Sequence, residues 1–304
     1  MATLTTAGLT ALGVNLPPEI LDPWLDKVQY GSAIAALSGS APMKFGTGQA
    51  LTFDIGEAEY VGEGANKSSS TVTSKVMTTA PFKFQKTVRW TDEVKWSDED
   101  EQLGVIAQIL QLIQPALSRA LDFGIIHGIN PADGTTVTAM TKKLANVTNT
   151  VTKNPTDKAY LALDAADALV LAGDYIPSDV ALSPALAAAF MAARSTMTEQ
   201  KLYPNLTLNT AVSELEGHRA SVSRTINAQG VITPTPNILG IVGDFAAIRW
   251  GIQRSIGLEM IQFGDPDGGG DLKRNNQIAF RAEVVYGWGI ADLDAFALIT
   301  GASE

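Results

Sequence analysis

Apolar and polar residues alternate most regularly between residues 81 and 91. Apolar side chains fall on one face of an extended chain there and polar ones on the other: Phe82, Phe84, Val88 and Trp90 against Lys83, Gln85, Thr87 and Arg89. This period of two predicts a β-strand. The run from residue 51 to 55 alternates in the same way and is its expected antiparallel partner, with the Gly-, Ser- and Thr-rich stretch 62–74 as the tip. Strands of about 10 to 13 residues predict a hairpin roughly 35 to 40 Å long, which lacks a visible apolar core and is marginal alone in water.

A long helix is predicted after this hairpin, over about residues 97–127. Ser97 is a suitable N-cap, and the carboxylates from Asp98 to Glu101 fall in the first turn, where the helix dipole favours negative charge. Apolar residues then recur every three or four positions as far as Ile125. Pro115 is expected to kink the helix because it removes one backbone hydrogen bond. A helix of roughly 45 Å beside a long hairpin predicts a flat, elongated subunit.

The remaining segments predict an arm and a region of mixed helices and strands. A helical apolar spacing over residues 18–38 predicts an amphipathic arm, and the polar stretch 129–157 predicts loops with short strands. From residue 158 the pattern predicts a helix, a buried strand and a helix that starts at Pro184, followed by further strands. Alternation over residues 276–286 predicts one of the last strands. The expected fold class is therefore α+β.

The composition is that of a globular protein and argues against several functional classes. Of 304 residues, 45% are hydrophobic and 18% charged, which suffices to bury a sizeable core. Neither a membrane span nor a signal peptide is indicated, so we expect a protein made and kept in the cytosol. The net charge of −10 argues against a surface that binds nucleic acid, although an acidic wall is compatible with enclosing DNA without holding it. Zero cysteines exclude disulfides and thiolate chemistry.

Two loop motifs suggest ligands but match poorly. In GDPDGGGDLKRNN, Asp265, Asp267 and Gly270 match three positions of a calcium loop, but a glycine and an asparagine stand at two other ligand positions. A glycine-rich hairpin turn is the better interpretation. In GEGANKSS, Asn66 replaces the glycine that precedes the lysine of a phosphate-binding loop, and no helical pattern follows.

The two histidines give little support to catalysis. His127 lies before Gly128 at the predicted helix end, where a capping role is expected. His218 has no evident base or nucleophile nearby, and no serine-elbow or paired-histidine motif occurs. We therefore expect no enzyme activity, no metal and no cofactor.

The charges of the predicted hairpin are segregated along the chain. Acidic residues precede and flank its tip: Asp54, Glu57, Glu59 and Glu63. Basic residues follow: Lys67, Lys75, Lys83, Lys86, Arg89 and Lys95. Pairing across the hairpin explains this arrangement as well as contact of a basic edge with an acidic neighbour does. The acidic helix start, with Asp98, Glu99 and Glu101, is the candidate neighbour, so these charged residues are candidates for contact between subunits.

The order of these parts resembles the major capsid proteins of tailed bacteriophages, the Hong Kong 97-type family. The most specific pieces are LDFGIIHGINP at 121–131 and NQIAFRAEVVYGWGIADLDAFALIT at 276–300, and VGDFAAIRWGIQRSIGLEM precedes the latter. The resemblance covers nearly the whole chain and implies the following parts: an N-terminal arm at 1–44, an extended E-loop hairpin at 45–92, a P-domain at 93–157 and 250–304 with its spine helix at about 97–127, and an α/β A-domain at 158–249.

In function, the resemblance implies a structural head protein that self-assembles as hexamers and pentamers into an icosahedral shell around double-stranded DNA. The E-loop lies across the neighbouring subunit in such shells, so another copy supplies the missing core. Implied partners are further copies, a portal, a decoration protein and, because the chain begins almost at the arm, a separate scaffolding protein or none. We expect to find the protein in the virion, after assembly in the bacterial cytoplasm. We expect neither sequence-specific DNA binding nor association with a membrane.

Two alternatives remain open at this point. An encapsulin, a nanocompartment shell of the same fold, would enclose a cargo enzyme instead of a genome. A soluble α/β enzyme built on residues 158–249 would be a monomer or small oligomer with a ligand pocket.

Some members of the family join an E-loop lysine to an asparagine of a neighbour, with a glutamate as base. By resemblance, Lys67 or Lys75, Asn276 and Glu283 are the candidates for these roles. Particles that show only monomers on a denaturing gel would remove this hypothesis.

Overall fold

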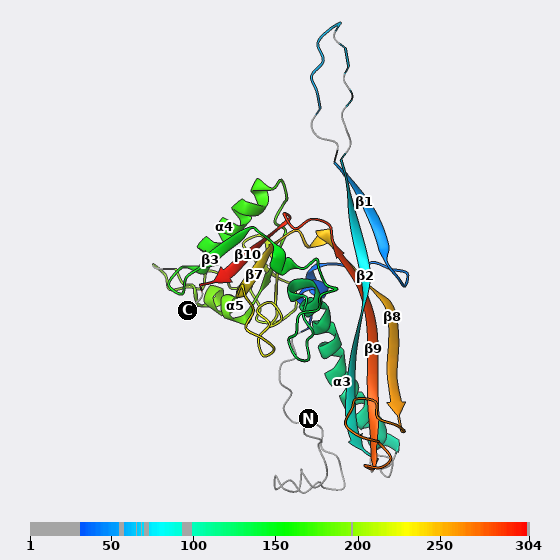
Figure 1. The fold of residues 1–304 in the computed structure, drawn as a ribbon. Helices are drawn as coiled ribbons and strands as arrows, with labels where there is room; N and C mark the ends of the chain where they lie inside the picture. Colours follow the sequence, from blue (N-terminus) through cyan, green and yellow to red (C-terminus); the bar gives the residue numbers. More distant parts are fainter. Residues whose placement is uncertain are drawn as a thin grey trace.

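The computed structural model describes residues 31–302 except 55–57, 65, 68, 70–72, 93–98 and 196. It combines a long sheet with a second, more compact layer of sheet and helices, which confirms the α+β class (Figure 1). Most of the predicted arm at 18–38 lies outside the described residues. Its last part forms the short helix α2 (Ala33–Leu37), and the Ser32 side chain accepts a hydrogen bond from the Ala35 amide as its N-cap.

The long sheet has the strand order β1-β2-β9-β8. Its strands are β1 (Gly48–Asp54), β2 (Thr73–Thr91), β9 (Gln277–Ile290) and β8 (Ile248–Ile261). β2 is one continuous strand with two successive partners, because residues 73–79 pair with β1 and residues 80–91 pair with β9. The strand predicted at 82–90 is therefore confirmed, but its expected partner was wrong: β9 pairs with this part, and 51–54 pairs further out.

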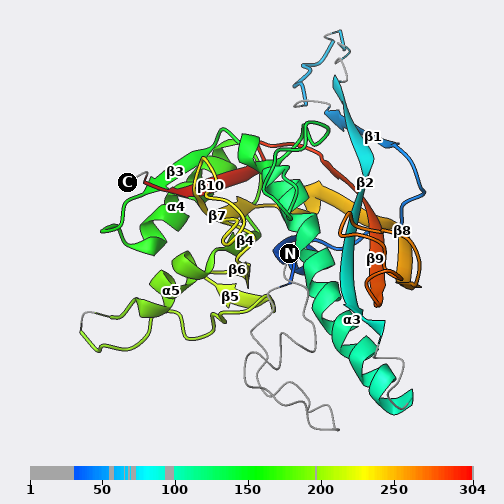
Figure 2. The ribbon, with the colours of Figure 1, turned by 60° about the horizontal axis from the view of Figure 1, so that its bottom comes forward.

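The predicted long helix is confirmed. α3 (Glu99–Asp122) contains Pro115 and continues into the π-helix η2 (Phe123–His127), whereas the expected N-cap position lies outside the described residues. Gly128 ends η2 with a φ of 65°, a left-handed conformation that glycine adopts without a steric penalty. Figure 2 shows α3 lying along the long sheet.

Apolar packing holds α3 and η2 against this sheet. Ile109 and Ile113 of α3 form a buried cluster with Ile278 and Phe280 of β9. At Gly124 the contact is so close that a Cβ atom would lie 2.6 Å from the ring of Trp288. A glycine is thus required where η2 crosses β9, because any larger side chain would displace the helix or the indole.

The second sheet has six strands in the order β3-β10-β7-β4-β6-β5. They are β3 (Thr150–Lys153), β10 (Phe296–Gly301), β7 (Ile238–Gly243), β4 (Asp179–Leu182), β6 (His218–Val222) and β5 (Ser213–Leu215). α4 (Ala159–Ala172) and α5 (Pro184–Ala192) pack on one face, and Ser183 caps α5. The helices and the strand predicted between residues 158 and 192 are confirmed.

The opposite face of this sheet packs into a larger buried core that it shares with α2, η2 and the long sheet. Alternate residues of β4 separate the two sides: Val180 and Leu182 lie with α4 and α5, and Ala181 lies in the larger core. That larger core also holds Ile34 of α2, Ile125 of η2 and aromatic residues of β9. Short turns complete the connections, η3 (Leu144–Asn146) and η4 (Phe245–Ala247).

The six-stranded sheet extends beyond the segment 158–249 that was predicted as one α/β domain. β3 comes from the stretch before it, and β10 comes from the end of the chain. Alternation identifies strands but does not show which distant strands pair, so sequence alone did not place β3 and β10 in this sheet. Among the described residues, no helix is long and apolar enough to cross a membrane.

Candidate functional site

A hairpin projects from the body, and we call its residues 48–79 the finger. β1 pairs with 73–79 of β2 in antiparallel register, from Gly48 opposite Thr79 to Asp54 opposite Thr73 (Figure 1). Of its described side chains, few are buried: Met77 and Thr79 near the base. Tyr60 near the tip is 92% exposed. A two-stranded ribbon with so little burial cannot draw much stability from its own packing.

The base of β2 differs from the finger, because it has a core in its own chain. Phe82 packs on Trp288 with ring centroids 4.1 Å apart, and Phe84 stacks on the same indole at 6.2 Å. Both phenylalanines pack against the larger buried cluster. The expectation that the whole predicted hairpin lacks a core is therefore wrong for residues 80–91. Their partner strand lies about 190 residues away in the sequence, so no local pattern of residues indicates this pairing.

Two of the basic candidates are engaged within the chain. The Lys83 ammonium lies 2.8 Å from Glu283 of β9 while its side chain remains 57% exposed. Arg89 is covered, with a side chain only 6% exposed. Pairing across the hairpin predicted that acidic residues of β1 would be the partners of these two cations. Lys83 and Arg89 instead pair with β9 and with the loop between β8 and β9.

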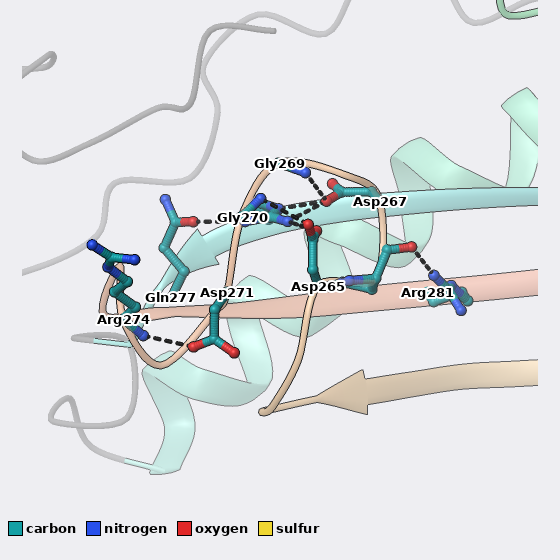
Figure 3. Close-up of polar contacts among 10 residues, drawn as sticks. Asp265, Asp267, Gly269, Gly270, Asp271, Arg274, Gln277 and Arg281 are labelled. Carbon is teal, nitrogen blue, oxygen red and sulfur yellow. Dashed lines mark hydrogen bonds and ion pairs between the residues drawn. The ribbon is translucent and has the colours of Figure 1, made fainter.

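Arg89 organises the loop between β8 and β9. Figure 3 shows the loop residues Asp265, Asp267, Gly269 and Gly270. The Arg89 Nε donates to Asp267 Oδ1 at 2.7 Å, and its Nη2 donates to Asp265 Oδ1 at 2.8 Å. The backbone amides of Gly269 and Gly270 donate to the same two carboxylates. Hydrogen bonding to Arg89 lowers the pKa of Asp267. The guanidinium thus binds the two carboxylates that a calcium loop would use as ligands, which supports the interpretation of this stretch as a structural turn.

The other intersubunit candidates are only partly described. Lys67 and Lys86 are exposed, and so is Glu59. Asp54 lies in β1, Lys75 in β2, and Glu99 and Glu101 in the first turn of α3. Glu57 and Asp98 lie outside the described residues. Contact of these residues with a neighbour stays a prediction.

The residues proposed for a covalent crosslink do not form one site within a subunit. Asn276 lies in the turn before β9, exposed and with a φ of 52°. Glu283 lies seven positions further along the extended chain, which is about 20 Å away, and it is paired with Lys83. Within one subunit this glutamate is too far away to act as base at that asparagine, so the crosslink would need residues of different subunits, and it stays a prediction.

A buried carboxylate that the sequence analysis passed over ties three segments together. Asp122, at the end of α3, is fully buried and accepts hydrogen bonds from the Ser32 hydroxyl, from the Ala33 amide at 2.8 Å and from the Thr225 hydroxyl at 2.5 Å. Burial raises the pKa of Asp122 to about 6, although these hydrogen bonds act in the opposite direction. The signal in the sequence was a carboxylate within the apolar run LDFGII.

Both histidines have structural partners. His127 is buried, with Nε2 3.0 Å from the Thr225 carbonyl oxygen, and burial lowers the pKa of its ring. His218 Nε2 lies 3.1 Å from Asp167 on α4. The expectation that His218 has no base nearby is therefore wrong. Within the described part of the chain, no group of three or more His, Asp or Glu residues is arranged to hold a metal. These contacts join elements of the fold. The His127 ring meets a carbonyl of the distant segment around Thr225 and not the end of its own helix, so the expected capping role is wrong.

Comparison with known proteins identifies the class of protein to which this chain is similar. A solved structure from Mycobacterium phage Ogopogo is 40% identical with a TM-score of 0.82, covering 99% of this chain and 100% of that one. One from Gordonia phage Cozz is 27% identical with a TM-score of 0.77, covering 99% and 96%. A structure described as the capsid of a native GTA particle computed with C5 symmetry shares the fold at 14% identity, with a TM-score of 0.62 and coverage of 99% and 100%. No curated protein matches the chain.

The fold is thus that of a structural capsid subunit from a tailed phage. The profile described as phage capsid protein matches residues 75–299, from β2 to β10, and the chain belongs to this family. It is a structural major capsid protein, and the Hong Kong 97-type architecture implied by resemblance is consistent with the observed parts. The match does not support the encapsulin and soluble-enzyme alternatives.

Proposed function

We propose that this chain forms the hexamers and pentamers of an icosahedral Hong Kong 97-type shell around double-stranded DNA. The observation that carries the proposal is the finger, which extends from the body and whose described side chains are mostly exposed. An isolated two-stranded ribbon is marginal in water, so a surface of a neighbouring subunit has to stabilise it. Each subunit both offers a finger and receives one, which generates a closed ring of identical contacts.

The many repeated contacts explain how weak individual interfaces hold a shell together. Each contact raises the effective concentration of the next one, so modest affinities combine into a stable particle. The net charge of −10 suits a wall that encloses DNA without binding its sequence or holding its phosphates. The role is structural, with no catalytic step, no cofactor and no membrane.

We also propose where the shell assembles and which partners it has. The shell assembles in the host bacterial cytoplasm and becomes part of the virion. A separate scaffolding protein, a portal and a decoration protein are the expected partners, because a closed shell needs a curvature guide, an entry point for DNA and, in some particles, external reinforcement.

Shortening the finger tests this function. Asp54 faces Thr73 across the hairpin, so replacing residues 55–72 with Asn-Gly closes β1 and β2 by a two-residue turn and leaves the body intact. We expect circular dichroism of the folded subunit to be unchanged and particles to be lost from a sizing column and from electron micrographs. Normal yields of closed particles from the shortened chain would contradict the proposal.

A further inference from the structure

One segment, residues 31–41, is held by several parts of the subunit at once, and we call it the clasp (Figure 2, dark blue). It consists of α2 and the residues on either side. Toward α3, the Ser32 amide donates to Ser118 Oγ at 3.2 Å, and the Ala33 amide donates to Asp122 at 2.8 Å. The start of the clasp is thus attached to the end of the long helix.

The six-stranded sheet holds the clasp at both ends of α2. The hydroxyl of Ser223, just after β6, donates to the Gly31 carbonyl oxygen at 3.0 Å. Arg219 of β6 donates from Nη2 to the Leu37 carbonyl oxygen at 2.7 Å. The clasp therefore joins this sheet to α3, two parts of the fold that are far apart in the sequence.

The long sheet provides a third attachment, at β8. The Ala41 amide donates to the Trp250 carbonyl oxygen at 2.8 Å, and Trp250 Nε1 donates to the Ser38 carbonyl oxygen at 3.1 Å. At Gly251 a Cβ atom would lie 2.0 Å from the Ala41 carbonyl oxygen, whereas at Gly257 no described atom lies within 4 Å of it. The absence of a side chain at Gly251 thus allows the clasp to lie directly against this part of β8.

Charged groups hold α2 at both ends and have other partners in the body. The Asp122 carboxylate accepts at its N-terminal end and the Arg219 guanidinium donates at its C-terminal end, which matches the helix dipole. The Thr225 hydroxyl also donates to Asp122, and Arg219 Nε donates to Asp179 at 2.6 Å. Departure of the clasp would therefore leave both charged groups with a partner.

α2 is too short to be stable alone. It has five residues, whereas isolated helices shorter than about 12 to 15 residues are marginal in water. Ile34 and Leu37 anchor it in the larger core, and hydrogen bonds supply its other attachments. Because no part of the clasp is stable apart from the body, loss of some attachments weakens the rest, and we expect the segment to open as a whole.

The clasp lies between two segments that the proposed shell uses for contact. It falls within the predicted arm at 1–44, and β1 of the finger begins shortly after it, at Gly48. Between them the Gln253 side chain of β8 makes two hydrogen bonds with the Gly46 backbone, at 3.0 and 2.9 Å. The clasp and this contact therefore fix the point from which the finger extends.

We propose that the clasp closes on the folded body and opens from it as one unit, and that the closed clasp pre-organises the arm and the finger for assembly. Closure fixes the points from which these two segments extend, so less conformational entropy is lost when neighbours bind them. The effect on assembly rests on the proposed function, whereas opening of the clasp is a property of the single subunit.

Hydrogen exchange of unassembled subunits tests whether the clasp opens as one unit. The amides of Ala33, Ser38 and Ala41 are hydrogen-bonded within the clasp or to its anchors. They should share one opening equilibrium and exchange faster than the core amides of β7, which need global unfolding. Exchange of these three amides only together with β7 would overturn the proposal.

Two substitutions at opposite ends of the clasp show whether those ends are coupled. Ser32→Ala removes the N-cap hydroxyl, and Gly251→Ala places a methyl group against the Ala41 carbonyl oxygen. Each should raise the exchange of all three amides about five- to tenfold. Ser40→Ala at an exposed position and Gly257→Ala are the matched controls and should raise none. Acceleration confined to the substituted end would contradict opening as a unit.

A disulfide tests the effect on assembly. Ser32→Ala with Ile34→Ala removes the cap and a core anchor, so the clasp should be mostly open and particle yield should fall at least about tenfold. The chain has no cysteine, and a Cβ at Gly31 would lie 3.6 Å from Thr210 Oγ1. Adding Gly31→Cys with Thr210→Cys therefore allows a disulfide that closes the clasp. Oxidation should restore the yield, and Gly31→Cys alone should restore nothing.

The outcomes separate the clasp from the proposed function. Recovery of particles on oxidation and their loss on reduction support pre-organisation by the clasp, and Ser32→Ala with Gly251→Ala repeats the test on a core that keeps Ile34. Natural yield from the open variants, or no recovery once the disulfide has formed, overturns it. If the unmodified chain forms no particles, the proposed function is wrong, and the exchange experiment still decides whether the clasp opens.

Discussion

Asp122→Asn should remove a pH dependence of folding stability that Asp122 creates. The folded-state pKa of about 6 lies above the ordinary value of 3.8 because the carboxyl group is fully buried. Between these two values the unfolded chain releases its proton while the folded chain keeps it. The contribution of Asp122 to stability is thus complete below about pH 4 and is lost as the pH rises through about 6. This pKa difference corresponds to about 3 kcal/mol.

The variant carries a second cost that does not depend on pH. The amide of the introduced asparagine keeps one acceptor oxygen, but its NH₂ group takes the place of the other oxygen and faces the donors to that oxygen, either Ser32 and Ile34 or Ala33 and Thr225. A buried polar group without a proper partner costs about 1 to 3 kcal/mol. The variant should therefore be less stable at acidic pH, and the natural chain should lose about 3 kcal/mol of stability relative to it toward neutral pH, which closes or reverses the difference.

Urea unfolding of unassembled subunits between pH 4 and 8 measures this difference. The comparison between the two chains is needed because His127 also titrates: burial lowers its pKa, so its contribution is lost as the pH falls. Asp164→Asn is the control, since Asp164 is exposed on α4. A constant difference between the natural chain and Asp122→Asn across this pH range would refute the reasoning.

Three further predictions concern packing, the loop between β8 and β9, and covalent links. Gly124→Ala should destabilise the subunit by about 1 to 3 kcal/mol in thermal unfolding, because its Cβ would meet the β9 indole, whereas Gly62→Ala, with open space around it, should be neutral. Arg89→Ala should cost about 1 to 3 kcal/mol and speed proteolysis of residues 262–276, whereas Arg254→Ala at an exposed position should do neither. Particles boiled in detergent should show only monomers on a gel; a ladder would contradict this expectation and support a covalent link from Lys67 or Lys75 to Asn276 of a neighbour.

Local periodicity predicted the elements of this fold well. The strand at 82–90, the helix through His127, and the α/β elements from α4 to α5 follow from spacing that a few neighbouring residues define. The Gly-rich stretch 264–276 could be read as a turn because two of its presumed metal ligands were missing. These features depend on residues that are close in sequence.

Features that depend on distant partners were not predictable in the same way. The pairing of residues 80–91 with β9 and the insertion of β10 beside β3 join segments far apart in the chain. The role of Asp122 depends on donors about 90 and 103 positions away, which no local pattern marks. The resemblance identified the class, whereas the contacts that shape its candidate surfaces needed coordinates.

Electron microscopy of the purified protein tests the central claim most directly. A finger with little packing of its own should be ordered only against a neighbour, so the protein should form closed particles of uniform size in which each finger crosses an adjacent subunit. A population that consists of monomers or small oligomers at every concentration, with the finger folded on its own body, would contradict the account.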